Sequence, residues 1–174
     1  MWSASLAADD MATLYALDFL IEARQRGLVV SDDLLARTLD YAEALANRPS
    51  EGMEDLRQRA YAAYLLTREG RKAGRLLADI REQYEVYHDD TWRRDLGAAY
   101  LAAAYRLMQE DRQADALFAD VPWQLLSPWQ RSGQYSDPLI HDAERLTLMS
   151  RHFAAARKSV PETVLDRMGE AIAA

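Results

Sequence analysis

The chain has 174 residues, a formal net charge of −7 at pH 7 and an isoelectric point near 5.0. Nucleic-acid binding depends on clustered Lys and Arg that neutralise phosphates, whereas here 21 basic residues are outnumbered by 28 acidic ones and form no basic stripe. Because there is no cysteine, disulfides, thiolate catalysis and cysteine metal sites are excluded. The composition therefore excludes a nucleic-acid partner, and the length allows one sizeable core.

Helix signals recur along the whole chain, and strand signals are nearly absent. Gly27 and Gly70 stand where a helix C-terminus favours a left-handed residue. Ser31 precedes two aspartates, which places an N-cap hydroxyl and two carboxylates at the positive end of a helix dipole. Ser159 opens "SVPE", the pattern of a capping box. The predicted helices span residues 6–26, 31–47, 53–69, 73–87, 92–109, 111–120, 138–153 and 161–173.

The predicted helices fall into two kinds. The second, fourth, sixth and eighth are amphipathic, with apolar residues three and four positions apart on one face. The first, third and fifth are apolar on most sides, in "LYALDFLI" (14–21), "AYAAYLL" (60–66) and "LGAAYLAAAYRLM" (96–108). In the last of these only Arg106 is polar, yet the stretch is too short and too closely flanked by charges to span a membrane. Such helices must be enclosed by protein.

Inner helices that alternate with amphipathic outer helices predict an all-α fold of four antiparallel hairpins in two layers. The inner helices recur roughly every 40 to 45 residues, which does not fit the 34-residue tetratricopeptide unit. HEAT-like stacking and an α/α toroid, in which hairpins close into a barrel, both have a suitable period. The toroid accounts better for the apolar inner helices, which small residues such as Gly97 and Ala102 would let approach closely. We therefore predict a single α/α-toroid domain over residues 1–174.

Residues 121–137, "VPWQLLSPWQRSGQYSD", form a long non-helical loop in this scheme. Long loops inside compact domains often carry function. One interpretation is that Trp123, Trp129 and Tyr135 contact a neighbouring domain. The alternative is that Trp123 and Trp129 close one end of the barrel.

No motif of the sequence identifies a catalytic, cofactor-binding or metal site. His88, Asp89 and Asp90 carry metal-ligating groups, but adjacent residues face one ion only in an unusual turn, and either aspartate would serve as the N-cap of the next helix. His141 and Asp142 are neighbours on a predicted helix and are expected to point to different sides, so they do not predict a catalytic dyad. Serine-hydrolase, phosphate-loop and zinc-protease motifs are absent. We expect no cofactor, no metal and no enzyme activity.

The order of several helical motifs resembles a known family. "MATLYALDFLIEARQRGLVVSDDLLARTLDYAEAL" is similar to the helical thioester-containing domain of bacterial alpha-2-macroglobulins, in which a Tyr-Ala-x-x-Phe-Leu-x-Glu-Ala helix precedes a Gly and a second helix. "RAYAAYLLTREGR", "LADIREQY", "LGAAYLAAAYRLM" and "YSDPLIHDAERLTLM" resemble the next units of that domain. The sequence departs from the family pattern at Ser31, where Pro is frequent, and at "SDPLIHDAE".

The resemblance implies a non-catalytic scaffold segment of a broad-spectrum endopeptidase inhibitor that traps proteases. The family's Cys-x-Glu-Gln thioester motif is absent, so either it lies upstream or the parent belongs to the class that lacks it. Four hairpins instead of the family's six imply an incomplete toroid with an apolar edge near Trp2 and Leu6. The implied partners are other domains of the parent chain and, through the whole protein, its target proteases.

The location of the protein follows from the same resemblance. No signal peptide is visible, since the N-terminus is acidic and lacks a basic region followed by an apolar one, which indicates either a cytosolic protein or a piece of a larger exported chain. The resemblance implies a periplasmic parent, anchored to the inner membrane, of which this segment makes no direct membrane contact. Two other functions stay open on the residues alone: an α/α-barrel enzyme acting on carbohydrate or isoprenoid, and a HEAT-like protein-interaction adaptor.

Overall fold

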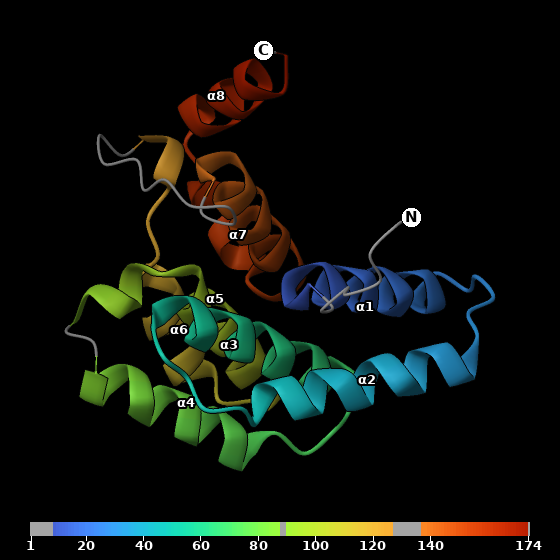
Figure 1. Ribbon diagram of the computed structural model, residues 1–174. Coiled ribbons are helices and arrows are strands. Elements are labelled where there is room, and N and C mark those ends of the chain that lie inside the picture. Colours follow the sequence, from blue (N-terminus) through green and yellow to red (C-terminus); the bar gives the residue numbers. More distant parts are fainter. Residues whose placement is uncertain (1–8, 88–89, 127–136, 174) are drawn as a thin grey trace, which may run out of the picture. The chain divides into compact units, whose positions relative to one another are not determined.

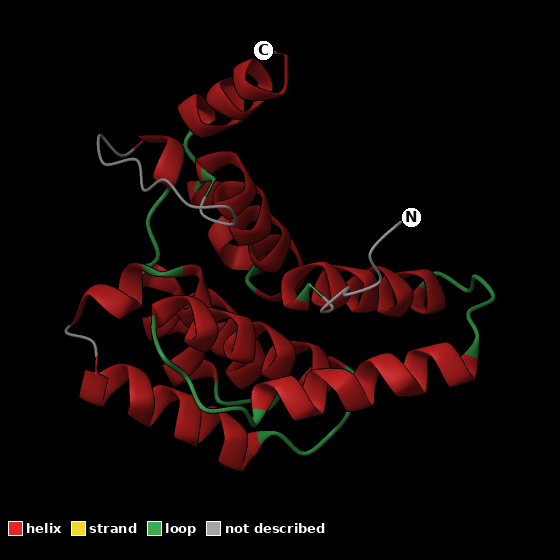
Figure 2. Ribbon diagram, viewed as in Figure 1, coloured by secondary structure: helices red, strands yellow, loops and turns green. Residues whose placement is uncertain are grey.

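The computed structural model describes residues 9–87, 90–126 and 137–173, and within these ranges the regular secondary structure is helical, with no strand (Figures 1 and 2). The prediction of an all-α fold is therefore confirmed. The helices are α1 (Asp10–Gln25), α2 (Asp32–Ala46), α3 (Met53–Arg68), α4 (Gly74–Tyr87), the 3₁₀ turn η1 (Asp90–Arg94), α5 (Leu96–Leu107), α6 (Asp111–Asp120), η2 (Gln124–Leu126), α7 (Pro138–His152), η3 (Ala154–Ser159) and α8 (Glu162–Ala173).

The chain forms two compact units, Met1–Trp92 and Arg93–Ala174. In the first, α3 packs against α1, α2 and α4, and α1 also packs against α2. In the second, α5 packs against α6 and α7. The single domain over 1–174, the toroid and its apolar edge stay predictions; Trp2 and Leu6 lie outside the described residues.

Several helix ends follow the local chemistry of the sequence. Gly27 and Gly70 adopt φ values of 78° and 74°, the left-handed conformation that a residue without Cβ enters at little cost. The Ser31 hydroxyl accepts a hydrogen bond from the Leu34 N–H at 3.3 Å, as expected of an N-cap. Gly27 and Ser31 mark the two ends of the α1–α2 connection, and Gly70 marks the beginning of the α3–α4 connection.

Two predicted caps are wrong. The Ser159 hydroxyl donates to the Ala156 carbonyl at 2.6 Å, so it closes the η3 turn, and α8 begins only at Glu162. Asp90 opens the separate turn η1, whereas the cap of α5 is Asp95, whose carboxylate accepts from the Gly97 N–H at 2.8 Å. In both cases a 3₁₀ turn occupies residues that the sequence pattern joined to the following α-helix, because short 3₁₀ turns use the same residue types.

The middle helix of each unit is enclosed as predicted. In α3 the residues from Arg59 to Leu66 are all buried, and in α5 the ten residues Leu96–Tyr105 are all buried. The neighbouring outer helix α6 turns Ala114, Leu117 and Phe118 inward. The small side chains of α5 explain its position, because Gly and Ala let other helices approach the backbone closely.

Two helices differ from the predicted pattern. Although α1 was expected to be enclosed, Phe19 on it is 70% exposed. In α8 the predicted apolar face buries only Val164, while Ile172 on the same face remains 74% exposed. Helix α8 packs on η2 rather than pairing closely with α7, and η3 packs on α7. An apolar periodicity shows which face can be buried, but the tertiary partner decides whether it is.

Buried arginines hold the helices of the first unit together. Arg59 on α3 donates to the Ala46 carbonyl, to Ser50 Oγ and to Asp79 Oδ2 at 2.6–2.8 Å, which links α2, the α2–α3 loop and α4. Arg68, at the end of α3, forms ion pairs with Asp18 and Glu22 of α1. The Arg68 side chain is 4% exposed. Removing one member of these ion pairs would therefore leave a buried charge without a partner and lower the stability of the fold.

Replacing a small residue of α5 by a large one is expected to destabilise the protein. Ala102→Leu, and likewise Gly97→Leu, should lower the free energy of unfolding by about 1–3 kcal/mol, because added methylenes have no space in a packed core. Ala116→Leu, at an exposed position on α6, is the matched control and should leave it nearly unchanged. Urea unfolding followed by circular dichroism measures all three. Equal midpoints for Ala102→Leu and the wild type would contradict the enclosed position of α5.

Removing the Arg68 guanidinium is expected to loosen the contact between α1 and α3. Arg68→Met should cost about 3 kcal/mol, the lower end for a broken buried pair, since Asp18 and Glu22 keep some exposure. The control Arg37→Met removes the exposed Arg37–Asp33 pair and should cost less than about 1 kcal/mol. Chemical denaturation of both variants gives the two values. An equal loss of unfolding free energy in both variants would show that the buried ion pairs stabilise the protein no more than the exposed one.

Candidate functional site

The predicted contact loop is described only at its beginning and its last residue. Val121 is buried, Trp123 is half-buried, and η2 follows at Gln124–Leu126, so this part contains a helical turn rather than plain loop. Trp129 and Tyr135 lie outside the described residues. Of the three proposed contact residues, the structure therefore places Trp123.

Asp142 of α7 holds the η2 turn in place. Its side chain is fully buried, and its two carboxylate oxygens accept hydrogen bonds from the backbone N–H groups of Gln124 and Leu125 at 2.7 and 2.9 Å. A carboxylate is suited to this task because it offers acceptors only and satisfies N–H groups that a helical turn leaves open. The backbone next to Trp123 is thereby fixed against α7.

The structure brings His141 and Asp142 together, contrary to the sequence prediction. His141 Nδ1 lies 3.1 Å from Asp142 Oδ1. Neighbouring residues on a helix start in different directions, but the carboxylate is drawn toward η2 by its two N–H donors, and the imidazole reaches the same oxygen. Since both carboxylate oxygens already serve the backbone of η2, this contact has a structural explanation and does not define a catalytic dyad.

A stack of alternating aromatic rings and guanidinium groups crosses the second unit. The Arg145 guanidinium lies 3.8 Å from the centroid of the Trp123 ring and 5.4 Å from that of Phe118. Phe118 stacks on Phe153 with centroids 4.0 Å apart, and Arg106 lies 4.9 Å from the Phe153 ring. We call these five residues the arginine–aromatic stack. It ties α5, α6, α7 and the start of the contact loop together through cation–π contacts.

The two arginines of the stack differ in how their charge is satisfied. Arg106 pairs with Asp111 at 2.7 Å and with Asp115. Arg145 has Asp142 nearby, and burial lowers the pKa of Arg145 to about 10, so it is still a cation at neutral pH. Buried Nε and Nη1 of Arg145 and buried Nε2 of His141 find no hydrogen-bond partner in the described part of the chain. Arg145 is thus a buried cation of which two nitrogens, Nε and Nη1, lack acceptors among the described residues.

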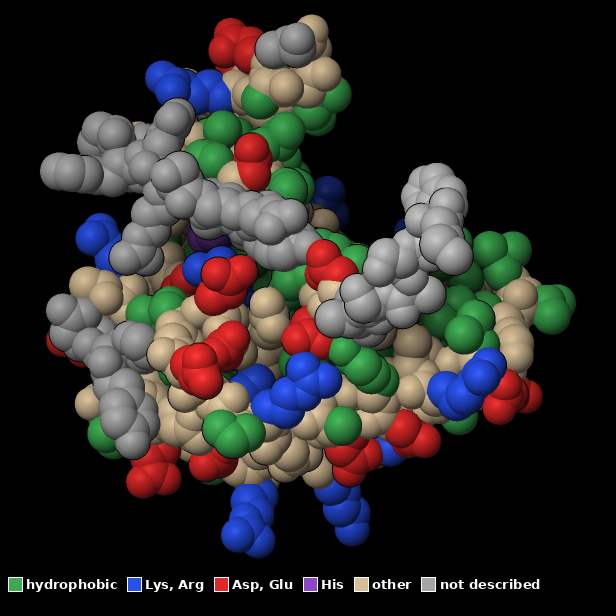
Figure 3. Space-filling view, viewed as in Figure 1, with side chains coloured by type: hydrophobic (Ala, Val, Ile, Leu, Met, Phe, Trp, Pro, Cys, Tyr) green, Lys and Arg blue, Asp and Glu red, His purple; other side chains and the backbone are tan. Residues whose placement is uncertain are grey.

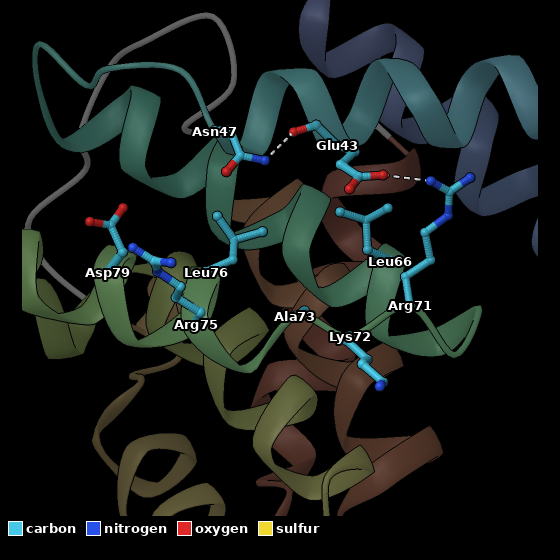
Figure 4. Close-up of a pocket in the computed structure, with 9 residues that line it drawn as sticks. All are labelled: Glu43, Asn47, Leu66, Arg71, Lys72, Ala73, Arg75, Leu76 and Asp79. Carbon is cyan, nitrogen blue, oxygen red and sulfur yellow. Dashed lines mark hydrogen bonds and ion pairs between the residues drawn. The ribbon is translucent and has the colours of Figure 1, made fainter.

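A separate groove of ≈ 460 Å³ lies in the first unit, between α2, the α3–α4 connection and α4 (Figure 4). Arg71 at its edge pairs with Asp40 and Glu43, which raises the pKa of Arg71 through hydrogen bonding to these carboxylates. The groove is lined by apolar side chains and by charged side chains of both signs. Its lining residues are Glu43, Asn47, Leu66, Arg71, Lys72, Ala73, Arg75, Leu76 and Asp79.

The described residues offer little for catalysis. Within them no group of three or more His, Cys, Asp or Glu side chains is placed to hold a metal ion, and no helix is long and apolar enough to cross a membrane. Of the candidate cluster 88–90, His88 and Asp89 lie outside the described residues. On the face seen in Figure 3, acidic and basic side chains are interspersed rather than gathered by sign. That face therefore shows no patch of basic side chains such as a polyanion site requires.

The comparison with known proteins points to one family. The chain is 36% identical over 171 residues, 97% of its length, to a protein of Yersinia pestis named alpha-2-macroglobulin homolog. It is 36% and 33% identical, over 97% and 91% of its length, to alpha-2-macroglobulins of Pasteurella multocida and Rickettsia conorii. The chain is alpha-2-macroglobulin-like over nearly its whole length. The resemblance predicted from the helical motifs is thereby confirmed.

The alpha-2-macroglobulin relatives are far longer than this chain, which spans 8–9% of their length. No protein-family model matches the chain, and no solved structure matches it. The assignment to the helical thioester-containing domain of an alpha-2-macroglobulin stays a prediction from the motifs.

Sequence reasoning identified Trp123 in this alpha-2-macroglobulin-like chain but missed its partner Arg145. A usable signal existed for Arg106, the sole polar residue between Leu96 and Met108, since a charge within such a stretch needs specific partners. No such signal existed for Arg145, because "DAERL" (142–146) has the composition of an exposed helix face. Its burial depends on Trp123 and Phe118, which come from other elements.

Loss of the Asp142 carboxylate is expected to release η2. Asp142→Ala leaves the N–H groups of Gln124 and Leu125 without acceptors and should lower the free energy of unfolding by about 2–3 kcal/mol. Asp166→Ala, at an exposed position on α8, is the control and should change it little. Urea unfolding gives both values, and tryptophan fluorescence reports on the environment of Trp123. Retained stability in Asp142→Ala would refute the anchoring role.

Proposed function

We propose that this chain is a non-catalytic scaffold segment of an alpha-2-macroglobulin-like, broad-spectrum inhibitor of endopeptidases. The observation that carries the proposal is the 33–36% identity over nearly the whole chain to bacterial proteins named alpha-2-macroglobulin. On this proposal the parent acts in the periplasm, anchored to the inner membrane, and traps the protease as a whole. The segment itself neither touches the membrane nor performs chemistry.

The ion pairs support a scaffold role. The strongest charged contacts of the described residues join one helix to another: Arg68 to α1, Arg59 to α2 and α4, and Arg106 to α6. Carboxylates that serve such pairs are occupied by structural partners and held away from substrate chemistry. Helical units whose helices are tied together in this way can transmit a rearrangement of the parent chain without being part of a reaction.

The proposed docking surface of the scaffold lies at the beginning of the contact loop. Trp123 is half-buried and Leu126 is 41% exposed, and both stand on backbone that Asp142 and Arg145 fix from α7. Aromatic and apolar side chains on a rigid base favour protein contacts. Other domains of the parent chain are the proposed partners, with Trp129 and Tyr135 as further contact residues on sequence grounds.

The covalent chemistry of thioester-bearing family members cannot reside in this chain, which has no cysteine. Two forms of the proposal follow: a parent with the thioester elsewhere, which captures proteases covalently, or one without it, which captures them by enclosure. Both require the same scaffold, so the function of this segment does not depend on the choice.

Inhibition by the native protein tests the proposed function. The protein carrying this sequence is captured from its cells with an antibody to the 174-residue chain and incubated with trypsin, chymotrypsin and elastase. We expect cleavage of a large substrate such as casein to fall at least tenfold for all three proteases, because enclosure acts regardless of specificity. Cleavage of a small peptide substrate by the same samples should fall much less.

The matched control is the antibody eluate from cells in which the gene is deleted. Casein cleavage at the uninhibited rate in the presence of the native protein would overturn the proposal. Inhibition of one protease alone would overturn its broad specificity. Recovery from the soluble cytosol would overturn the periplasmic location.

A further inference from the structure

The guanidinium of Arg145 lies over aromatic rings, but two of its nitrogens have no hydrogen-bond acceptor among the described residues. Its central carbon lies over the rings of Trp123 and Phe118, 3.8 and 5.4 Å from their centroids. Its Nε and Nη1 are buried and lack acceptors in the described part of the chain, and the whole residue is 8% exposed. The N–H groups of a guanidinium point in its plane, so an acceptor for these two nitrogens has to lie in that plane.

The carboxylate of Asp142 accepts no hydrogen bond from these two nitrogens of Arg145. Asp142 exerts a favourable field on Arg145, but its oxygens are hydrogen-bonded to the N–H groups of Gln124 and Leu125. The segment 127–136, "SPWQRSGQYS", contains no Asp or Glu. A buried cation without a hydrogen-bonded counter-ion is costly in free energy, and an incoming anion removes that cost.

His141 adds a second unsatisfied nitrogen on the same side of α7. It precedes Arg145 by four residues, so the two side chains lie on one face of the helix. Its Nδ1 is engaged by Asp142, and its buried Nε2 has no partner in the described residues. Arg145 and a protonated His141 therefore offer donor groups on the same face of α7.

We propose that Nε and Nη1 of Arg145, together with His141 Nε2, bind the carboxylate of an Asp or Glu side chain in a polypeptide segment from another domain of the parent chain. A carboxylate carries the charge opposite to that of Arg145 and accepts strong, charge-assisted hydrogen bonds from guanidinium N–H groups, which a neutral hydroxyl or carbonyl does less strongly. The identity of the partner domain rests on the proposed function. The carboxylate chemistry rests on Arg145 and His141.

The surroundings favour a polypeptide over a free small acid. The half-buried ring of Trp123 lies on the guanidinium, and the exposed side chain of Leu126 belongs to the same turn. Apolar residues that flank an acidic side chain would contact these two groups. A free carboxylate would gain the ion pair without those contacts, and its affinity should be lower.

Nuclear magnetic resonance titration of this chain tests the inference. The resonance of the Arg145 Nε–H is followed while acetyl-Leu-Glu-Leu-amide, acetyl-Leu-Gln-Leu-amide or sodium acetate is added. We expect the glutamate peptide to shift this resonance to saturation, with a dissociation constant at least tenfold below those of the glutamine peptide and acetate. Because the resonance is assigned in the wild-type chain, the comparison does not depend on the folding of any variant.

Substitutions provide the matched controls. Arg145→Gln should weaken binding of the glutamate peptide at least tenfold, and Arg112→Gln, at an exposed position of α6, should leave it unchanged. Equal binding of the glutamate and glutamine peptides, or a silent Arg145 resonance, would overturn the carboxylate site. Acetate that binds as tightly as the glutamate peptide would overturn the polypeptide partner. The protease assay with the native protein can fail while this titration succeeds, so the two proposals are tested separately.

Discussion

The structure depends on helices that are buried over most of their surface. In α5 ten consecutive residues are buried, and α3 has a comparable run. A helix enclosed in this way cannot place charges along its length, because an unpaired charge in a packed interior is far less stable than in water. Within the buried runs of α3 and near the end of α5 the charged residues are accordingly Arg59 and Arg106, and each reaches a partner on another helix.

These arginines explain how the helices of each unit are fixed. Arg59 and Arg68 extend from α3 to the neighbouring helices, and Arg106 extends from the end of α5 to α6. A guanidinium suits this role because it offers five N–H groups in one plane and stacks on aromatic rings. Arg145 also lies over aromatic rings, but its Nε and Nη1 have no acceptor among the described residues. It therefore differs from the structural arginines and is the one proposed to bind a partner.

Much of the fold was predictable because helix formation is governed by local chemistry. Gly27, Gly70 and Ser31 set helix ends through properties of their own residue types, and the structure has them where the sequence placed them. The errors at Ser159 and Asp90 arose where a 3₁₀ turn and an α-helix start use the same residues. The sequence could not separate these two cases, since the difference is one hydrogen bond that the packing of the neighbouring turn decides.

The site was less predictable than the fold. Trp123 could be singled out from its position in a Pro- and Trp-rich segment, but its contact with Arg145 joins residues that are 22 positions apart and is visible in neither local pattern. The position of His141 against Asp142 likewise follows from η2, which draws the carboxylate toward it.

The sequence by itself determined the helical class, most helix ends, the enclosed nature of α5 and the similarity to alpha-2-macroglobulins, because each of these depends on residue types at short spacing or on residue order. Only the tertiary structure decided that Phe19 and Ile172 stay exposed, and that Nε and Nη1 of Arg145 are buried without an acceptor among the described residues. These properties depend on which surfaces meet, and that is set by the packing of whole helices rather than by any one segment.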